Sequence, residues 1–192
     1  MFTEALEKII PEIRGYARML CGDRERADDI VQNACLKAWD ARRRFDPNKG
    51  SFKAWMFTIT RNEFLQAVRQ QTRTHARDQG DQSVFAAGLS EDCQMLNRAA
   101  CSEAIQHLFT LKPEQRDVFI LVVVAGYSYE EAAKICKCSI GTIKSRINRA
   151  RARLETLYDD ASEASARGGR PRSFHAVADL LLYADRLVQR AA

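Results

Sequence analysis

The sequence predicts an all-α protein made of two small helical domains joined by a polar linker. The chain of 192 residues has only 9 Gly and 4 Pro, which argues against an all-β fold, and it is rich in residues that favour helices. Apolar residues recur with helical spacing through most of the chain. This periodicity fails from about Thr72 to Gln94, where the residues are polar, as expected of a linker.

The composition is that of a globular, mildly basic chain. Hydrophobic residues make up 46% of the sequence and the formal net charge is +5. This balance is compatible with a nucleic-acid partner without requiring one. The sequence shows no N-terminal signal and no apolar run near the ~18 residues that a membrane span needs. We therefore expect a cytoplasmic protein with no membrane insertion, in which the six cysteines are free thiols.

The Cys and His residues are too scattered to predict a metal site. Cys136 and Cys138 are separated by one residue, whereas a zinc knuckle has two residues between its cysteines. The sequence has no phosphate-cradling Gly loop and no nucleophile elbow. It therefore predicts no cofactor, no metal, no catalytic residue and no enzyme activity, and it leaves open a redox role for the two cysteines.

Two helices are expected before the first turn of the chain. The first covers residues 2–20, with Pro11 as a candidate bend, and carries an apolar stripe of Ala5, Leu6, Ile9, Ile13, Tyr16, Ala17 and Leu20. Asp23 is expected to cap the second helix, residues 24–44. On it Asp28 and Asp29 point about 100° apart, which favours a solvated or partner-docking face over a shared metal ion. Lys37 is expected to extend its stem along the apolar side.

Residues 45–50 (FDPNKG) predict a turn, and Ser51 is expected to cap the third helix. On this helix an apolar stripe with i, i+3, i+4, i+7 spacing consists of Phe52, Trp55, Met56 and Ile59. The residues off the stripe are Phe57, Thr60, Arg61, Asn62 and Phe64. Two interpretations remain open: the aromatic rings form the core, or rings and cations together hold single-stranded nucleic acid.

The second domain is expected to begin with a helix that ends before Leu111. Pro113 suits the first turn of the helix that follows. Residues 118–124 favour a strand by propensity, but their place within a series of helices predicts a buried helix.

Residues 127–154 predict two helices joined by a tight turn. Ser128 and Glu131 have the spacing of a capping box, and residues 136–139 are the expected turn. The second helix places Ile140, Ile143 and Ile147 on one side. Its opposite side carries Lys144, Ser145, Asn148, Arg149 and Arg151.

The basic second helix is the strongest functional signal in the chain. Residues 137–154 contain six Lys or Arg and no Asp or Glu. Basic and amide side chains on the second helix of such a pair are typical of a helix-turn-helix that reads DNA. A solvated basic face is the alternative, and the short turn and the absence of acids argue against it. Beyond it, a basic linker and an amphipathic helix at residues 174–190 are expected.

Both halves resemble an extracytoplasmic-function (group IV, sigma-70 family) sigma factor of bacterial RNA polymerase over residues 5–158. Residues 27–34 (ADDIVQNA), Trp39 and residues 52–62 (FKAWMFTITRN) are similar to sigma region 2. Residues 111–116 (LKPEQR) and the segments SYEEAAKI and GTIKSRINRAR are similar to sigma region 4. The segments YSYEEAAKICKC and IKSRINRAR are most similar to the subgroup that runs the general stress response in alphaproteobacteria.

The resemblance implies a division of the chain into four segments. Residues 1–72 would form region 2, residues 73–97 a flexible linker and residues 98–160 region 4. Residues 161–192 depart from the usual end of the family, and their role is unknown. The implied function is promoter-specific initiation of transcription, with core RNA polymerase, promoter DNA and an anti-sigma factor as partners.

The resemblance also implies three groups of contact residues. The β′ clamp helices of polymerase would bind this chain at Asp28, Asp29, Val31, Gln32 and Trp39. The β flap of polymerase would be a second contact. A base flipped from the −10 element would be held by the loop at residues 45–51 and by the third helix. The residues involved would be Phe45, Lys49 and Ser51 in the loop and Arg61 and Asn62 in the helix. The −35 element would be read by Lys144, Ser145, Asn148 and Arg149, with Arg146 and Arg151 on phosphates or in internal pairs. Several relatives have a larger side chain at Asn148, so their −35 preference does not carry over.

Two other function classes remain open at this point. A free-standing helix-turn-helix regulator would bind DNA tightly without polymerase, as a dimer on a palindrome. An enzyme or metal protein would need its Cys, His and carboxylate groups to converge, and their scattered spacing argues against that.

Overall fold

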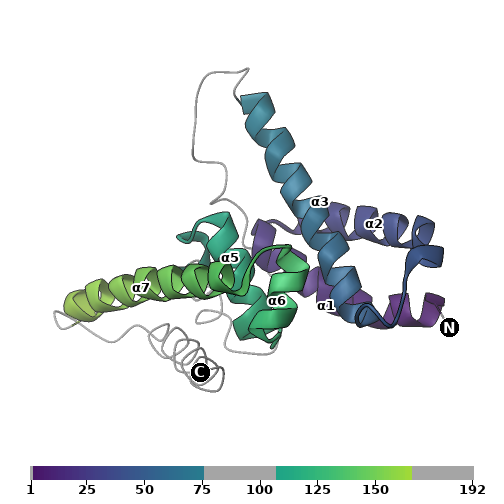
Figure 1. Cartoon of the computed structure of the whole chain (residues 1–192). Helices are drawn as coiled ribbons and strands as arrows, with labels where there is room; N and C mark the ends of the chain where they lie inside the picture. Colours follow the sequence, from purple (N-terminus) through teal and green to yellow (C-terminus); the bar gives the residue numbers. More distant parts are fainter. Residues whose placement is uncertain (1, 76–106, 166–192) are drawn as a thin grey trace. The chain divides into compact units, whose positions relative to one another are not determined.

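The computed structural model describes residues 2–75 and 107–165, and every regular element in these ranges is a helix. The chain divides into two compact units, Met1–Leu89 and Ser90–Ala192. Their described helices are drawn in purple to blue-teal and in teal-green to yellow-green in Figure 1. The prediction of an all-α chain with two helical domains is thus confirmed. Most of the expected linker, at residues 76–97, and the expected tail helix at residues 174–190 lie outside the described residues.

In the described part of the first unit, three α-helices pack against one another, each in contact with the other two. They are α1 (Phe2–Cys21), α2 (Arg24–Asp40) and α3 (Phe52–His75). The stripe expected on α1 supplies Ile9, Ile13, Tyr16, Ala17 and Leu20 to the core. Asp23 caps α2 as predicted, because its Oδ1 accepts a hydrogen bond of 2.8 Å from the N–H of Arg26. Gly22 has φ of 71°, the left-handed geometry that often ends a helix.

The second helix is shorter than the sequence predicts. It ends at Asp40 instead of residue 44, and Arg42–Arg44 form a separate 3₁₀ turn, η1. The N–H of Ala41 bonds the carbonyls of Lys37 and Trp39, and the guanidinium of Arg42 donates to the Trp39 carbonyl at 2.7 Å. The last carbonyls of α2 thus find donors without further α-helix.

The third helix turns a different face to the core than its periodicity indicates. Ser51 caps it as predicted, with its Oγ accepting from the N–H of Ala54 at 3.1 Å. Met56 is buried, but Phe52, Trp55 and Ile59 are only half-buried. The expectation that Phe57, Thr60, Arg61 and Phe64 lie off the core stripe is wrong, because all four are buried. The stripe is rotated because α3 packs on α1 and α2 together, as the 4.9 Å contact between the rings of Phe57 and Tyr16 shows.

The second unit is built from α5 (Pro113–Phe119), the π-helical turn η2 (Ile120–Val124), α6 (Tyr129–Cys136) and α7 (Ile140–Ser165). Pro113 occupies the first turn of α5, as predicted. Residues 118–124 are helical and not a strand, and residues 118–123 are buried, as their place among helices predicts. Val124, at the end of the π turn, is 45% exposed, so the expectation of burial is wrong for this residue. In η2 the N–H of Ala125 bonds the carbonyl of Ile120, five residues back, which marks the π turn.

Two charged residues lie inside the second unit. Arg116 and Asp117 are each almost fully buried. The guanidinium carbon of Arg116 lies 4.3 Å from the ring centroid of Phe109, and the thiol of Cys136 donates to a carboxylate oxygen of Asp117 at 3.9 Å. These contacts tie α5 to α6 and to the short helical segment before α5.

Candidate nucleic-acid interface

A serine caps the first turn of α6 and another caps the first turn of α7, the helix that carries the basic face. The Oγ of Ser128 accepts from the N–H of Glu131 at 3.2 Å, and a carboxylate oxygen of Glu131 accepts from the N–H of Ser128 at 2.9 Å. This reciprocal pair is the predicted capping box. Ser139 caps α7 in turn, since its Oγ accepts from the N–H of Thr142 at 3.1 Å. The caps fix where each helix begins.

A turn of three residues joins α6 to α7. Lys137 adopts the left-handed conformation, with φ of 52°. The N–H of Cys138 donates to the carbonyl of Ala133, five residues back, at 3.1 Å. This is the hydrogen bond of a Schellman motif, which ends a helix with one residue in the left-handed conformation. The chain therefore reverses sharply and forms the helix-turn-helix that the sequence predicts.

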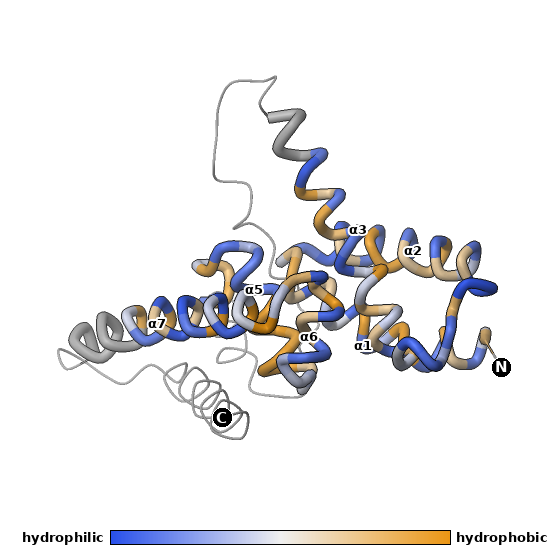
Figure 2. Tube along the Cα trace, viewed as in Figure 1, coloured by the Kyte–Doolittle hydropathy of each residue, from blue (hydrophilic) through white to orange (hydrophobic). Residues whose placement is uncertain are grey.

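One side of α7 is apolar and buried, and the other side is polar. Ile143, Ile147, Ala150 and Leu154 are buried against the rest of the unit, while Figure 2 shows α7 as mainly hydrophilic with apolar residues interspersed. Ile140, which the periodicity places on the apolar side, is instead 40% exposed. It is the first residue of the helix, where the body of the unit no longer covers it.

The residues expected to read the −35 element differ in how far they reach into solvent. Lys144, Asn148 and Arg149 are exposed. Ser145, Arg146 and Arg151 are half-buried, and the hydroxyl of Ser145 donates to the carbonyl of Thr142 at 3.0 Å. The exposed three are thus the side chains best placed to meet a ligand.

Arg151 lies close to the first helix of the pair. Burial raises the pKa of Tyr129 above its ordinary 10.0, and the positive charge of Arg151 partly offsets this rise. Such coupling requires the two side chains to be near each other. It favours an internal role for Arg151, one of the two roles that the sequence leaves open for it.

The residues expected at the −10 element lie in two places: the loop before α3, and a position about three turns into α3. Lys49 is exposed and pairs with Asp46 at 3.6 Å, and Ser51 is committed to its cap. Asn62 is exposed. Arg61 is buried in the core of the unit, so its guanidinium is not presented to an external ligand.

Five aromatic rings gather where α1 begins, α2 ends and α3 begins. This aromatic cluster consists of Phe2, Trp39, Phe45, Phe52 and Trp55, with ring centroids 5.2–6.4 Å apart in the contacting pairs. Trp39 is 45% exposed, and the other four rings are half-buried. The guanidinium carbon of Arg42 lies 4.7 Å from the Trp39 ring centroid. Partly exposed rings beside cations can stack unpaired bases.

The residues expected to dock on polymerase lie on α2. Asp29 and Gln32 are exposed, while Asp28 is half-buried and pairs with Arg14 at 3.0 Å. Val31 is buried, since it faces the other helices of the unit and not solvent. Leu36 is the residue that pattern reading missed, with 59% of its surface exposed. Leu36 and Trp39, three residues apart on α2, together form an exposed apolar patch, which is typical of a docking surface.

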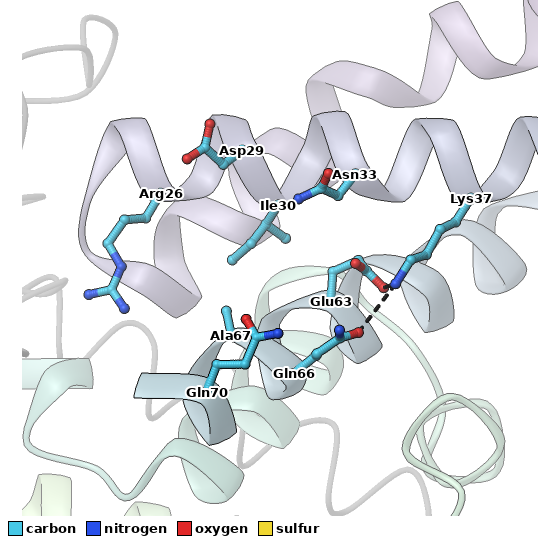
Figure 3. Close-up of a pocket in the computed structure, with 9 residues that line it drawn as sticks. All are labelled: Arg26, Asp29, Ile30, Asn33, Lys37, Glu63, Gln66, Ala67 and Gln70. Carbon is cyan, nitrogen blue, oxygen red and sulfur yellow. Dashed lines mark hydrogen bonds and ion pairs between the residues drawn. The ribbon is translucent and has the colours of Figure 1, made fainter. Parts of the chain in front are cut away.

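A groove of about 420 Å³ runs between α2 and α3. Figure 3 shows Arg26, Asp29, Ile30, Asn33 and Lys37 along α2 facing Glu63, Gln66, Ala67 and Gln70 on α3. The Nζ of Lys37 donates to Glu63 at 2.6 Å and to Gln66 at 3.2 Å. The groove is polar, and the ion pair and the hydrogen bond made by Lys37 link the two helices across it.

Neither a metal cluster nor a membrane-spanning helix is found in the described parts of the chain. No three His, Cys, Asp or Glu side chains there converge as metal ligands. No helix in those ranges is both long enough and apolar enough to cross a bilayer.

Comparison with known proteins assigns both units. Residues 6–74 match the family model of Sigma-70 region 2, and residues 105–154 match that of Sigma-70, region 4. The ECF RNA polymerase sigma factor EcfG of Rhodopseudomonas palustris is 39% identical over 155 residues, which cover 80% of this chain and 83% of the relative. The RNA polymerase sigma factor CnrH of Cupriavidus metallidurans is 33% identical over 71% of this chain and 75% of its own.

Solved structures give the same result. The sigma factor RpoE from Bartonella quintana, in complex with the anti-sigma factor NepR, is 35% identical with a TM-score of 0.72, covering 82% of this chain and 96% of that one. CnrH in complex with the cytosolic domain of CnrY is 27% identical with a TM-score of 0.59, covering 83% and 88%. The chain therefore belongs to the extracytoplasmic-function family of RNA polymerase sigma factors, the transcription initiation factors that the resemblance implies.

Proposed function

We propose that this sigma factor divides promoter recognition between its two units, with α7 reading the −35 duplex and the first unit capturing −10 bases. The observation that supports this most strongly is the exposed face of α7, a helix that Ser139 caps, in a stretch with no acid between residues 137 and 154. It is a promoter-specificity factor with no reaction of its own. It acts in the cytoplasm, where RNA polymerase works.

Reading of the −35 element falls to Lys144, Asn148 and Arg149. These side chains are exposed on the second helix of the pair, the element that enters the major groove in helix-turn-helix proteins. Arg and Lys suit guanine edges and Asn suits adenine edges. Ser145 and Arg146 are half-buried at the edge of this face, where they contact the phosphate backbone of the DNA.

Capture of a −10 base falls to the loop at residues 45–51 and to Asn62. The loop joins η1 to α3 and is flanked by the aromatic cluster, while Asn62 is exposed on α3. Flipping a base out of the stack costs a few kcal/mol, which stacking and edge contacts must offset. Phe45 offers a ring and Lys49 a charge for this purpose. Arg61 stabilises α3 from the inside and makes no base contact.

Docking on polymerase falls to the exposed side of α2. Asp29 and Gln32 point to solvent, and Leu36 extends this surface. Trp39, expected here from the resemblance, is assigned instead to the aromatic cluster at the end of the helix. The β′ clamp helices are the proposed partner, with Asp28 contributing through its exposed edge and Val31 only through packing. The second unit contacts the β flap.

An anti-sigma factor is the proposed regulator. Two structural relatives are seen in complex with an anti-sigma factor, NepR, and with the cytosolic domain of CnrY. The resemblance of residues 127–138 and 143–151 to the subgroup that runs the general stress response supports a place in that response. The regulator would cover the same docking and DNA-reading surfaces.

Run-off transcription tests the proposal. Purified core polymerase is assayed on candidate promoters with and without the full-length chain, and initiation should depend on the chain. Asn62→Ala should lose promoter opening while it keeps core binding in a pull-down. If the chain binds duplex DNA specifically but never stimulates core polymerase, the free-standing regulator takes its place.

A further inference from the structure

Phe2 holds the aromatic cluster together. Of the six ring contacts in the cluster, three are made by Phe2, to Trp39, Phe52 and Trp55 at 6.0, 5.4 and 6.4 Å. All three are edge-to-face, with interplanar angles of 64–86°, a favourable geometry for aromatic pairs.

Phe2 is also the link between α2 and α3 within this cluster. In the described residues, the ring contact of Trp39 is with Phe2 alone, whereas Phe45, Phe52 and Trp55 contact one another. Trp39 carries the cation of Arg42 over its ring. Without the Phe2 ring, the indole at the end of α2 would lose its aromatic connection to the rings at the start of α3.

The surroundings of the cluster suit a nucleic-acid strand. Arg42, Arg43 and Arg44 are exposed in η1, and Lys49 is exposed in the loop that follows. Rings beside a run of cations are how proteins hold unpaired bases and the backbone that joins them, with little dependence on base identity.

We propose that Phe2 is a positioning residue for the capture of unpaired promoter bases. It fixes Trp39 against the rings of α3, so that the two segments present one stacking surface. This inference rests on the base-capture role proposed above and adds a residue from the start of α1, far from the loop in sequence. Phe2 acts through the other rings, with three of which it makes edge-to-face contacts.

The chain itself provides the probe for this role. It has two tryptophans, and both belong to the aromatic cluster. Intrinsic tryptophan fluorescence of the full-length chain therefore reports on the cluster directly, even if a nucleic acid also binds α7. The probe is a short single-stranded oligonucleotide of randomised sequence, with a randomised duplex followed by anisotropy in parallel.

We expect the single strand to change tryptophan emission of the wild-type chain in a saturable way. Phe2→Ala should weaken this binding by about threefold to tenfold, because an edge-to-face partner is lost and Trp39 is no longer held. Phe2→Tyr keeps the ring and should restore wild-type affinity. Duplex affinity should stay unchanged in both variants. Ile10→Ala, a half-buried position on the same helix outside the cluster, is the matched control and should bind single strands like wild type.

The outcomes separate the inference from the function on which it rests. If single strands leave wild-type tryptophan emission unchanged, base capture at this cluster fails and the role of Phe2 fails with it. If wild type and Phe2→Ala respond with equal affinity, the role of Phe2 alone is overturned. If Phe2→Ala and Ile10→Ala weaken binding equally, Phe2 has only a general structural role and the inference is wrong.

Discussion

The Nζ of Lys37 on α2 lies 2.6 Å from Oε1 of Glu63 on α3 (Figure 3). The Glu63 side chain is only 10% exposed, whereas that of Lys37 is 52% exposed. The lysine therefore reaches from solvent to neutralise a carboxylate that α3 places near the core. Lys37 does not simply extend along the apolar side of α2, as its position in the periodicity indicates. The pair ties the helix proposed to dock on polymerase to the helix that carries Asn62.

Lys37→Ala should destabilise the first unit by about 1–2 kcal/mol, because the Glu63 carboxylate would stay largely desolvated without its cation. Urea unfolding followed by circular dichroism measures this change. Adding Glu63→Gln to Lys37→Ala should recover much of the loss, since a neutral amide costs less to bury. Lys49→Ala removes an exposed pair with Asp46 and should change stability by less than about 0.5 kcal/mol. Equal effects of Lys37→Ala and Lys49→Ala would contradict this account of the pair.

Ser128→Ala should destabilise the second unit by about 1 kcal/mol, because it removes the acceptor for the Glu131 N–H at the start of α6. Thermal unfolding monitored by circular dichroism provides the measurement. Ser128→Asp retains a side-chain acceptor and should unfold close to the wild-type temperature. A Ser128→Asp variant as unstable as Ser128→Ala would show that the hydroxyl does more than cap the helix.

Arg149→Ala should weaken binding to the −35 duplex by about 1–3 kcal/mol if the guanidinium bonds a base edge in the major groove. The measurement is fluorescence anisotropy with a promoter duplex identified by run-off transcription. Arg153, exposed one turn further along α7, is the matched cation. Arg153→Ala should lower affinity for promoter and random duplex alike, as loss of a phosphate contact does. Base reading by Arg149 is excluded if its variant keeps the wild-type ratio of promoter to random binding.

The second unit should lose stability at alkaline pH through Tyr129. Burial raises the folded-state pKa of Tyr129 above its ordinary 10.0, although the charge of Arg151 limits the rise. The folded state thus holds the phenol proton more tightly than the unfolded state does. This contribution to stability is complete below about pH 10 and is lost as the pH rises through the folded pKa.

Tyr129→Phe isolates that contribution, because it removes the titrating hydroxyl and keeps the ring. Between about pH 9 and about pH 11, the free energy of unfolding of the wild-type chain should fall more steeply than that of Tyr129→Phe. Other groups also titrate in this range, among them Cys35, because burial raises the pKa of its thiol. Their contributions are the same in both proteins and cancel in the difference between the two curves. Parallel curves would mean that Tyr129 has no folded-state preference for its proton.

Features that depend on a few neighbouring residues could be predicted well. The caps at Asp23, Ser51 and Ser128 each use a side chain and an N–H three residues apart. The turn between α6 and α7 and the acid-free stretch after it are equally local. These interactions form whenever the segment is helical, whatever the rest of the chain does.

Features that depend on which helices meet could not be read from periodicity. On α3 two apolar arcs are available, one with Phe52 and Trp55 and one with Phe57 and Phe64. Only contact with α1 and α2 decides that the second arc enters the core. Arg61 and Val31 were expected to contact DNA and polymerase, but both are buried. A sequence pattern gives the residue types along a helix and does not show which side of the helix its neighbours cover.

The sequence by itself determined the helical class, the helix starts, the two-part organisation and the basic face of α7, because local hydrogen bonds, spacing and charge are properties of short segments. Tertiary structure alone decided the buried face of α3, the exposure of Leu36 and Ile140, the Lys37–Glu63 pair and the aromatic cluster that Phe2 joins. These features bring together residues from separate helices, and their formation depends on burial free energy summed over the whole unit.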